Sequence, residues 1–243
     1  DITVSGGAIS NFSATSSTVY TATFTPSAQG ATTIDVAANT FTDAVGNNNS
    51  AATQFNWTYD NVAPTLASAS PSDNQTDFPF SSNIVLIFSE TVTAGSGNVL
   101  ISTGSNTNGD FESIAIDDDS ITFNSERIII NPSGTFQSEG SYNVLIPSTA
   151  IKDPAGNFFA GITSATTLNF TIKDYVAPTM TITATDGSNA VTDGASTDDA
   201  TLTVTFTSSE ATTNFAAADI TVSGGAISNF SATSSTVYTA TFT

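Results

Sequence analysis

Residues 202–210 read LTVTFTSSE, the clearest indication of the fold class in this sequence. Leu202, Val204 and Phe206 alternate with threonine. A period of two residues is typical of a β-strand with one buried face and one solvated face. Threonine is β-branched and suits the solvated side of a pleated surface. The stretch therefore predicts a strand with its apolar side chains inward and a glutamate at its end.

The same alternation recurs along the whole chain, and no segment follows the 3.6-residue period of a helix. Strands of this kind, spaced by roughly 8–12 residues with about seven in each domain, predict an all-β sandwich. The apolar residues that alternate are Tyr20, Ala22 and Phe24; Phe55, Trp57 and Tyr59; Tyr142, Val144 and Ile146; and Leu168, Phe170 and Ile172.

A long exact repeat shows how the chain is organised. The sequence DITVSGGAISNFSATSSTVYTATFT occupies residues 1–25 and recurs letter for letter at residues 219–243. The repeat period, from residue 1 to residue 219, is 218 residues. Repetition at a fixed period is the sequence signature of a tandem array. We therefore expect the chain to be a window on a longer array, with neither end at a natural domain boundary.

A weaker repeat divides the period into two related halves. The segments DNVAPT and DYVAPT each follow an aromatic-rich strand, and their valines, Val62 and Val176, lie 114 residues apart, which leaves 104 residues for the other half. Proline fixes φ and removes a backbone donor, so VAPT suits a stiff linker or a first edge strand. Two other landmarks recur in the same order: a strand ending in glutamate (IVLIFSE at 84–90, LTVTFTSSE at 202–210) and a turn (KDPAGN at 152–157, TDAVGN at 42–47).

The VAPT linker, the strand ending in FSE, the late Asp-x-x-Gly-Asn turn and the threonine-rich strands resemble bacterial Ig-like domains, which stack in tandem in giant surface adhesins and biofilm proteins. Residues 62–174 resemble the S-layer-associated subtype. The resemblance implies tandem Ig-like β-sandwich domains of about seven strands each. With the repeat phase, it predicts the C-terminal part of a type A domain at 1–61, a complete type B domain at 62–175 and the N-terminal part of the next type A domain at 176–243.

Composition excludes several classes of function. The chain has 22 acidic residues, 3 basic ones, a net charge of −19, and neither histidine nor cysteine. The absence of these two residue types excludes a Ser-His-Asp triad, a thiol nucleophile, disulfides and thiolate or histidine zinc sites. Three basic residues cannot neutralise nucleic-acid phosphates, and no apolar run approaches the roughly 20 residues of a membrane span. We expect no nucleic-acid partner, no membrane insertion in this segment and no enzymatic activity.

Acidic side chains are predicted to meet at the junction that precedes the complete domain. In a sandwich of this type, the loops after the second and sixth strands lie at the pole where the preceding domain attaches. Glu90 would start the first of these loops, Asp153 and Asn157 would lie in the turn of the second, and the linker brings Asp60 and Asn61. Carboxylate and amide oxygens are ligands that Ca²⁺ prefers. The resemblance also implies calcium at domain junctions.

The next junction repeats the pattern. Asp174 and Glu210 would be joined there by the following copy's equivalent of Asp43. The alternative at both junctions is that Asp-x-x-Gly-Asn is only a turn, in which Asp and Asn bond to the local backbone and Gly supplies positive φ. A further acidic run, Asp117–Asp119, lies between ESIAI and SITFN and is interpreted as the solvated tip of a hairpin.

These observations favour a non-enzymatic structural repeat of an extracellular fibre or a cell-surface adhesin stalk on a secreted protein, with calcium stiffening its junctions. Its expected partners are neighbouring copies of itself, in the same chain or head to tail. One alternative is a module that binds a glycan, a host receptor or another matrix ligand through loop tips, for which Phe158 and Phe159 are the candidate aromatics. Another is a short subunit that assembles into a filament by strand complementation.

Overall fold

The strands form several separate sheets, as the alternating pattern predicts. The computed structural model describes residues 1–243. The chain divides into two units, Asp1–Asp174 and Tyr175–Thr243. The fold is all-β apart from one short 3-10 helix, η1 (Ala217–Asp219). No helix is long and apolar enough to span a membrane.

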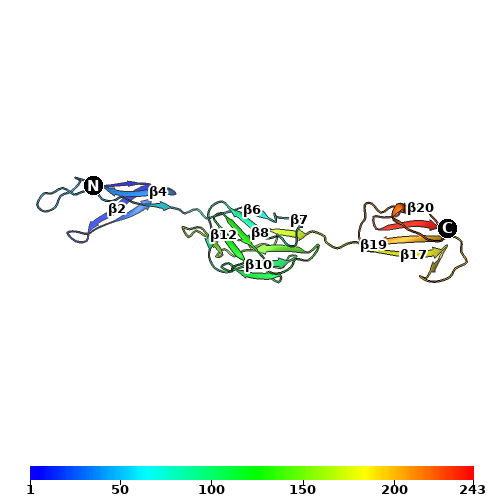
Figure 1. Cartoon of the computed structure of the whole chain (residues 1–243). Coiled ribbons are helices and arrows are strands. Elements are labelled where there is room, and N and C mark those ends of the chain that lie inside the picture. The colour runs from blue at the N-terminus through cyan, green and yellow to red at the C-terminus, as the bar shows by residue number, and fades with distance from the viewer. The chain divides into compact units, whose positions relative to one another are not determined.

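Residues 60–174 form a sandwich of two facing sheets, drawn in cyan to yellow in Figure 1. The first sheet has the order β11 (Glu112–Ala115), β10 (Asn98–Thr103), β14 (Ser141–Leu145), β16 (Asn169–Ile172), β7 (Gln75–Phe78). The second has the order β12 (Ile121–Asn124), β13 (Arg127–Ile130), β8 (Ile84–Phe88), β6 (Leu66–Ser70). A small pair, β15 (Ile151–Lys152) and β9 (Thr93–Ala94), lies beside them.

The core of this sandwich is continuous and comes from both sheets. In β8, Ile84, Leu86 and Phe88 are buried and alternate with half-buried residues. On the facing sheet, Phe170 of β16 is 1% exposed and lies among aromatic rings, with centroid distances of 5.2 Å to Phe78, 5.6 Å to Phe136 and 5.9 Å to Tyr142. Since there are no disulfides, apolar packing of this kind holds the two sheets together.

Two expectations for this sandwich are wrong in detail. Its five-, four- and two-stranded sheets contain more strands than the expected seven, and one of the additional strands comes from a break in the first strand of the domain. Pro71 separates β6 from β7, and these two strands join different sheets. The run Asp117–Asp119 is not a hairpin tip, because β11 pairs with β10 whereas β12 pairs with β13. The run instead connects the two sheets, and its side chains are exposed as expected.

Residues 1–59 form a three-stranded sheet and a separate hairpin. The sheet has the order β1 (Ile2–Ser5), β4 (Gly30–Val36), β5 (Phe55–Tyr59), and the hairpin consists of β2 (Gly7–Ala14) and β3 (Tyr20–Pro26). Phe24 of the hairpin and Trp57 of the sheet meet edge to face at 4.8 Å. The buried Thr32 hydroxyl donates to the Trp57 carbonyl, 2.9 Å away.

Residues 175–243 form one five-stranded sheet. Its order is β18 (Asn189–Val191), β17 (Met180–Asp186), β19 (Leu202–Ser208), β21 (Val237–Phe242), β20 (Ile227–Ala232). Phe206, Tyr238 and Ala240 are its buried apolar residues, and Phe215 packs against them. The stretch that predicted the fold class is thus the central strand, β19, of this sheet.

Candidate metal centre

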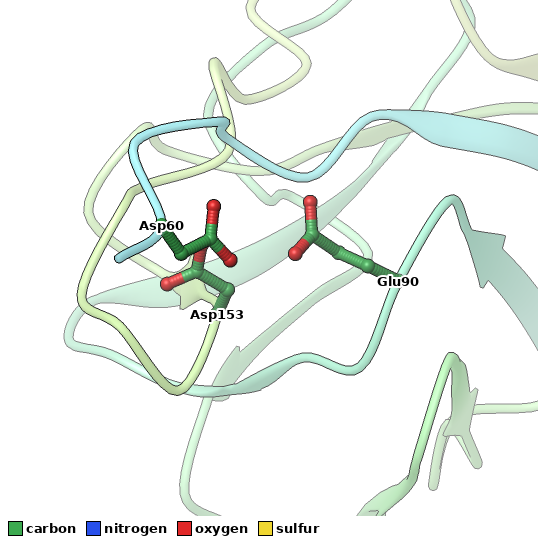
Figure 2. A group of neighbouring side chains, drawn as sticks. All are labelled: Asp60, Glu90 and Asp153. Carbon is green, nitrogen blue, oxygen red and sulfur yellow. The ribbon is translucent and has the colours of Figure 1, made fainter. Parts of the chain in front are cut away.

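Three of the predicted acidic residues converge at one end of the 60–174 sandwich. Asp60, Glu90 and Asp153 each place one carboxylate oxygen within 4.8 Å of the other two. Figure 2 shows the three carboxyl groups turned toward one another from separate segments of the chain. Asp153 is 1% exposed, and the other two are half-buried. Asp60 and Glu90 are 30 positions apart in the sequence, and Glu90 and Asp153 are 63 positions apart, yet the three residues form one acidic cluster.

Asp153 is held by the turn that it begins. Its Oδ1 accepts hydrogen bonds from the backbone N–H groups of Gly156 (2.6 Å) and Asn157 (2.8 Å), and its Oδ2 accepts one from the Asn157 side chain (2.8 Å). Gly156 has a φ of +99°, which favours glycine. Burial raises the pKa of Asp153, but the hydrogen bonds from Asn157 and the turn backbone outweigh it, so the pKa lies below its ordinary value. Asp153 is therefore ionised in spite of being buried.

Asn157 joins this turn to the linker. Its side-chain nitrogen also donates to the Asp60 backbone carbonyl, 3.2 Å away. The Asp60 carboxylate in turn accepts a hydrogen bond from the backbone N–H of Val62 at 3.0 Å. Asn61, by contrast, is exposed. The turn thus fixes Asp60 beside Asp153.

Glu90 is positioned by a clasp between the linker and the end of β8. The Ser89 backbone N–H donates to the Thr65 carbonyl (2.9 Å), and the Ser89 hydroxyl accepts from the Thr65 N–H (3.0 Å). Neither Ser89 nor Thr65 is among the residues predicted for the site. The sequence did carry a signal for this contact, because a Ser-Glu pair follows both β8 and β19. After β19, Ser209 makes the same two bonds to Thr179, each of 2.9 Å. The clasp places the glutamate directly after the linker contact in both units.

The electrostatics of the cluster oppose a charged Glu90. Burial raises its pKa, and the nearby charges of Asp60 and Asp153 raise it further. The neighbours that shift this pKa are thus other carboxylates. Three acidic groups held together in this way would gain from a cation that supplies the missing positive charge.

The other predicted residues are placed elsewhere. Asp43 lies in a closely similar turn: its Oδ1 accepts from the N–H groups of Val45 (3.0 Å) and Asn47 (2.9 Å), and its Oδ2 accepts from the Asn47 side chain (2.8 Å). These bonds lower its pKa, yet Asp43 is exposed. Asp174 accepts a hydrogen bond from Ser138 at 3.1 Å and ends the first unit, whereas Glu210 belongs to the second. The site predicted from these three residues spans separate parts of the chain and stays a prediction.

The candidate aromatic pair beside the turn divides between surface and core. Phe158 is 48% exposed, whereas Phe159 is 7% exposed and packs edge to face on Phe88 at 5.2 Å. Only one ring of the pair therefore faces solvent.

Comparison with known protein families agrees with this architecture. A family model described as a bacterial Ig-like domain matches residues 60–172, and a second model with the same description matches residues 1–59 and 174–243. The chain belongs to the bacterial Ig-like domains. A comparison with curated proteins and one with solved structures gave no match. Bacterial Ig-like domains are typically non-enzymatic and often extracellular, so membership indicates a structural or adhesin-type surface module.

Proposed function

We propose that this chain is a non-enzymatic structural repeat of an extracellular stalk or fibre, which provides length and stiffness and is made rigid by calcium at its domain junctions. The observation that supports the proposal most directly is the acidic cluster of Asp60, Glu90 and Asp153. One of the three residues, Asp60, belongs to the linker that enters the sandwich. A cation bound there would tie the linker to the body of the domain.

The cluster has the ligand chemistry that calcium requires. Ca²⁺ takes 6–8 oxygen ligands and tolerates irregular geometry, so three carboxylates can provide much of the set and backbone carbonyls or water the rest. Burial and then the charges of Asp60 and Asp153 raise the pKa of Glu90, and a bound divalent cation would relieve the repulsion among these carboxylates. The prearranged turn at Asp153 lowers the entropic cost of ordering one ligand.

The same elements support a second site at the next junction. Asp174 precedes Thr179 by the interval that separates Asp60 from Thr65, and Glu210 follows Ser209 as Glu90 follows Ser89. The clasp is repeated there, and the Asp43 turn has the conformation of the Asp153 turn. In a continuous array these residues would form a site equivalent to that of Asp60, Glu90 and Asp153.

Titration calorimetry with CaCl₂ on the 243-residue chain tests the first site. We expect binding that Asp153→Asn abolishes or weakens strongly, because the buried turn carboxylate is lost. Asp43→Asn is the matched control, since it removes the same residue from the same turn where no acidic cluster surrounds it. Equal effects of the two substitutions, or no calcium binding by the parent chain, would exclude the cluster as a calcium site.

Stiffness is tested with a polypeptide that carries one repeat period in the order 60–218 followed by 1–59. It contains the junction at Asp174 together with Glu210 and Asp43. Small-angle scattering is expected to show a longer and more rigid particle in calcium than in EDTA. Identical scattering curves would show that calcium does not stiffen that junction, and they would not contradict a role of the chain as a spacer.

A further inference from the structure

The first strand of the 60–174 sandwich is divided between its two sheets. β6 is the edge strand of one sheet and pairs there with β8, and β7 is the edge strand of the other and pairs there with β16. The linker that contains Asp60 leads into β6, and the chain leaves the sandwich after β16. Beyond the clasp at Ser89, a pull on the linker therefore reaches the body of the domain through β6, β7 and their two partner strands.

β7 and β16 run parallel and are bonded at both ends of their pairing, where Phe78 lies beside Ile172 at the downstream end. At the upstream end, the Asn74 backbone N–H donates to the Asn169 carbonyl, 2.8 Å away. At the downstream end, the Lys173 N–H donates to the Phe78 carbonyl, 3.0 Å away. The first and last strands of the sandwich are thus joined directly to each other.

Side chains strengthen both ends of this pair. Upstream, Asp73 Oδ1 accepts hydrogen bonds from the backbone N–H of Asn169 (3.2 Å) and from its side chain (2.9 Å). Downstream, Phe78 is 2% exposed and packs edge to face on Phe170 at 5.2 Å. A charge-assisted anchor therefore holds one end of the pair, and a buried aromatic contact holds the other.

The two strands leave the sandwich in opposite directions. The linker meets the sandwich at the end that holds Glu90, because Leu66 at the start of β6 lies opposite Phe88. β7 and β16 both run away from that end, and the chain departs after Lys173 at the other end of the sandwich (Figure 1). Tension between the linker and residue 174 would therefore draw β7 back toward Glu90 and β16 the opposite way, so that the strands are pulled along each other.

We propose that the β7–β16 pair is a force-bearing clamp, in which the contacts between residues 73–78 and 169–173 carry tension in shear and set the force at which the sandwich unfolds. The bonds of a parallel ladder are evenly spaced along the strands. Under shear they share the load, whereas peeling puts the whole load on one bond at a time. Forced unfolding is governed by the unfolding rate, so the strands that carry the load decide the mechanical resistance.

The clamp rests on the proposed stalk role, because a module within a stalk or fibre is pulled along its length. It does not depend on calcium, since Asp73 and its partners lie outside the cluster of Asp60, Glu90 and Asp153. Tweezers apply the tension directly, and EDTA keeps the metal site empty. The failure of the clamp would therefore leave the stalk role standing, and the failure of calcium stiffening would leave the clamp standing.

The direction of pulling provides the first test. The chain has no cysteine, so a pair of introduced cysteines gives the sole attachment points for DNA handles in optical tweezers. Ala63→Cys with Lys173→Cys pulls β7 and β16 in shear, whereas Ser81→Cys with Lys173→Cys pulls from neighbouring strand ends and peels them apart; all three residues are exposed. In EDTA we expect the unfolding force to be higher by about twofold or more in shear, because several ladder bonds share the load. Equal forces in the two directions would overturn the proposal.

Loss of the anchor provides the second test, in the chain that carries the shear attachment points. Asp73→Ala is expected to raise the unfolding rate under load by about tenfold, the effect of losing a hydrogen bond to a charged group. Asp110→Ala is the matched control: Asp110 is also exposed and accepts from the Thr103 N–H (2.9 Å) and the Asn106 side chain (2.8 Å), but its loop lies between β10 and β11, outside the loaded pair. The control should lower the Tm as Asp73→Ala does and leave the rate under load unchanged. An unchanged rate for Asp73→Ala, or an equal increase for Asp110→Ala, would overturn the proposal.

Discussion

In EDTA at pH 7, Glu90→Gln is expected to make the 60–174 sandwich more stable than the parent, and in calcium the order is expected to reverse. The carboxylate of Glu90 faces those of Asp60 and Asp153, and its pKa is raised by burial and further by these two charges. Without a cation, neutral glutamine removes this repulsion. With calcium, glutamine removes a ligand, and the parent gains about 2.7 kcal/mol when free calcium is 100 times the Kd, or roughly 10 °C in Tm.

Glu90 and Asp153 make the stability of the sandwich depend on pH in opposite directions. Because the folded-state pKa of Glu90 is above its unfolded value, the folded chain binds the extra proton, and this group destabilises the fold as pH rises through the raised pKa. The advantage of Glu90→Gln in EDTA should therefore vanish as the pH falls below the ordinary value of 4.5. Asp153 acts oppositely: its pKa is lowered, so its contribution is present above the unfolded pKa and lost as pH falls through the folded one.

Calorimetric melting curves between pH 4 and pH 8, in calcium and in EDTA, check both statements. Glu126→Gln is the control, since Glu126 is exposed and lies outside the cluster, and it should change the free energy of unfolding by less than about 0.5 kcal/mol. A Glu90→Gln chain that is less stable than the parent in EDTA at pH 7 would show that the carboxylates do not repel one another.

Phe170→Ala is expected to destabilise the 60–174 sandwich by about 3–5 kcal/mol, through lost burial and the cavity left between the sheets. Phe170 is 1% exposed and contacts the rings of Phe78 and Phe136. Several kcal/mol corresponds to a fall of roughly 15 °C or more in Tm. Thermal unfolding of the full chain, followed by calorimetry, gives the value.

The control for this substitution is Phe158→Ala. Phe158 is 48% exposed, so its loss should cost less than about 1 kcal/mol. Comparable losses for the two phenylalanines would mean that the core does not depend on the aromatic cluster around Phe170.

Local sequence was sufficient wherever a feature depends on neighbouring residues. The alternation in residues 202–208 predicted β19, and the Asp-x-x-Gly-Asn pattern predicted two turns in which the aspartate accepts the same two hydrogen bonds from the asparagine. The convergence of Glu90, Asp153 and Asp60 was predicted from the order of strands in the resembling domains, because topology brings certain loops to one pole.

Features that depend on partners distant in sequence could not be predicted from local sequence patterns. The segment after Ile116 looked like a hairpin, but a local pattern cannot reveal that its two strands join different sheets. The clasp of Ser89 with Thr65 was missed for the same reason, since it joins residues 24 positions apart.

The duplicated 25 residues separate the two kinds of information most clearly. Those residues alone specify the hairpin, its register and its bulge, because cross-strand pairs and turn bonds within them favour one conformation. Tertiary contacts make Tyr238 buried and Tyr20 exposed, and they make Ile2–Ser5 a strand whereas residues 220–223 are not. The physical reason is that burial and sheet pairing require a second surface, and an identical sequence cannot specify which surface lies beside it.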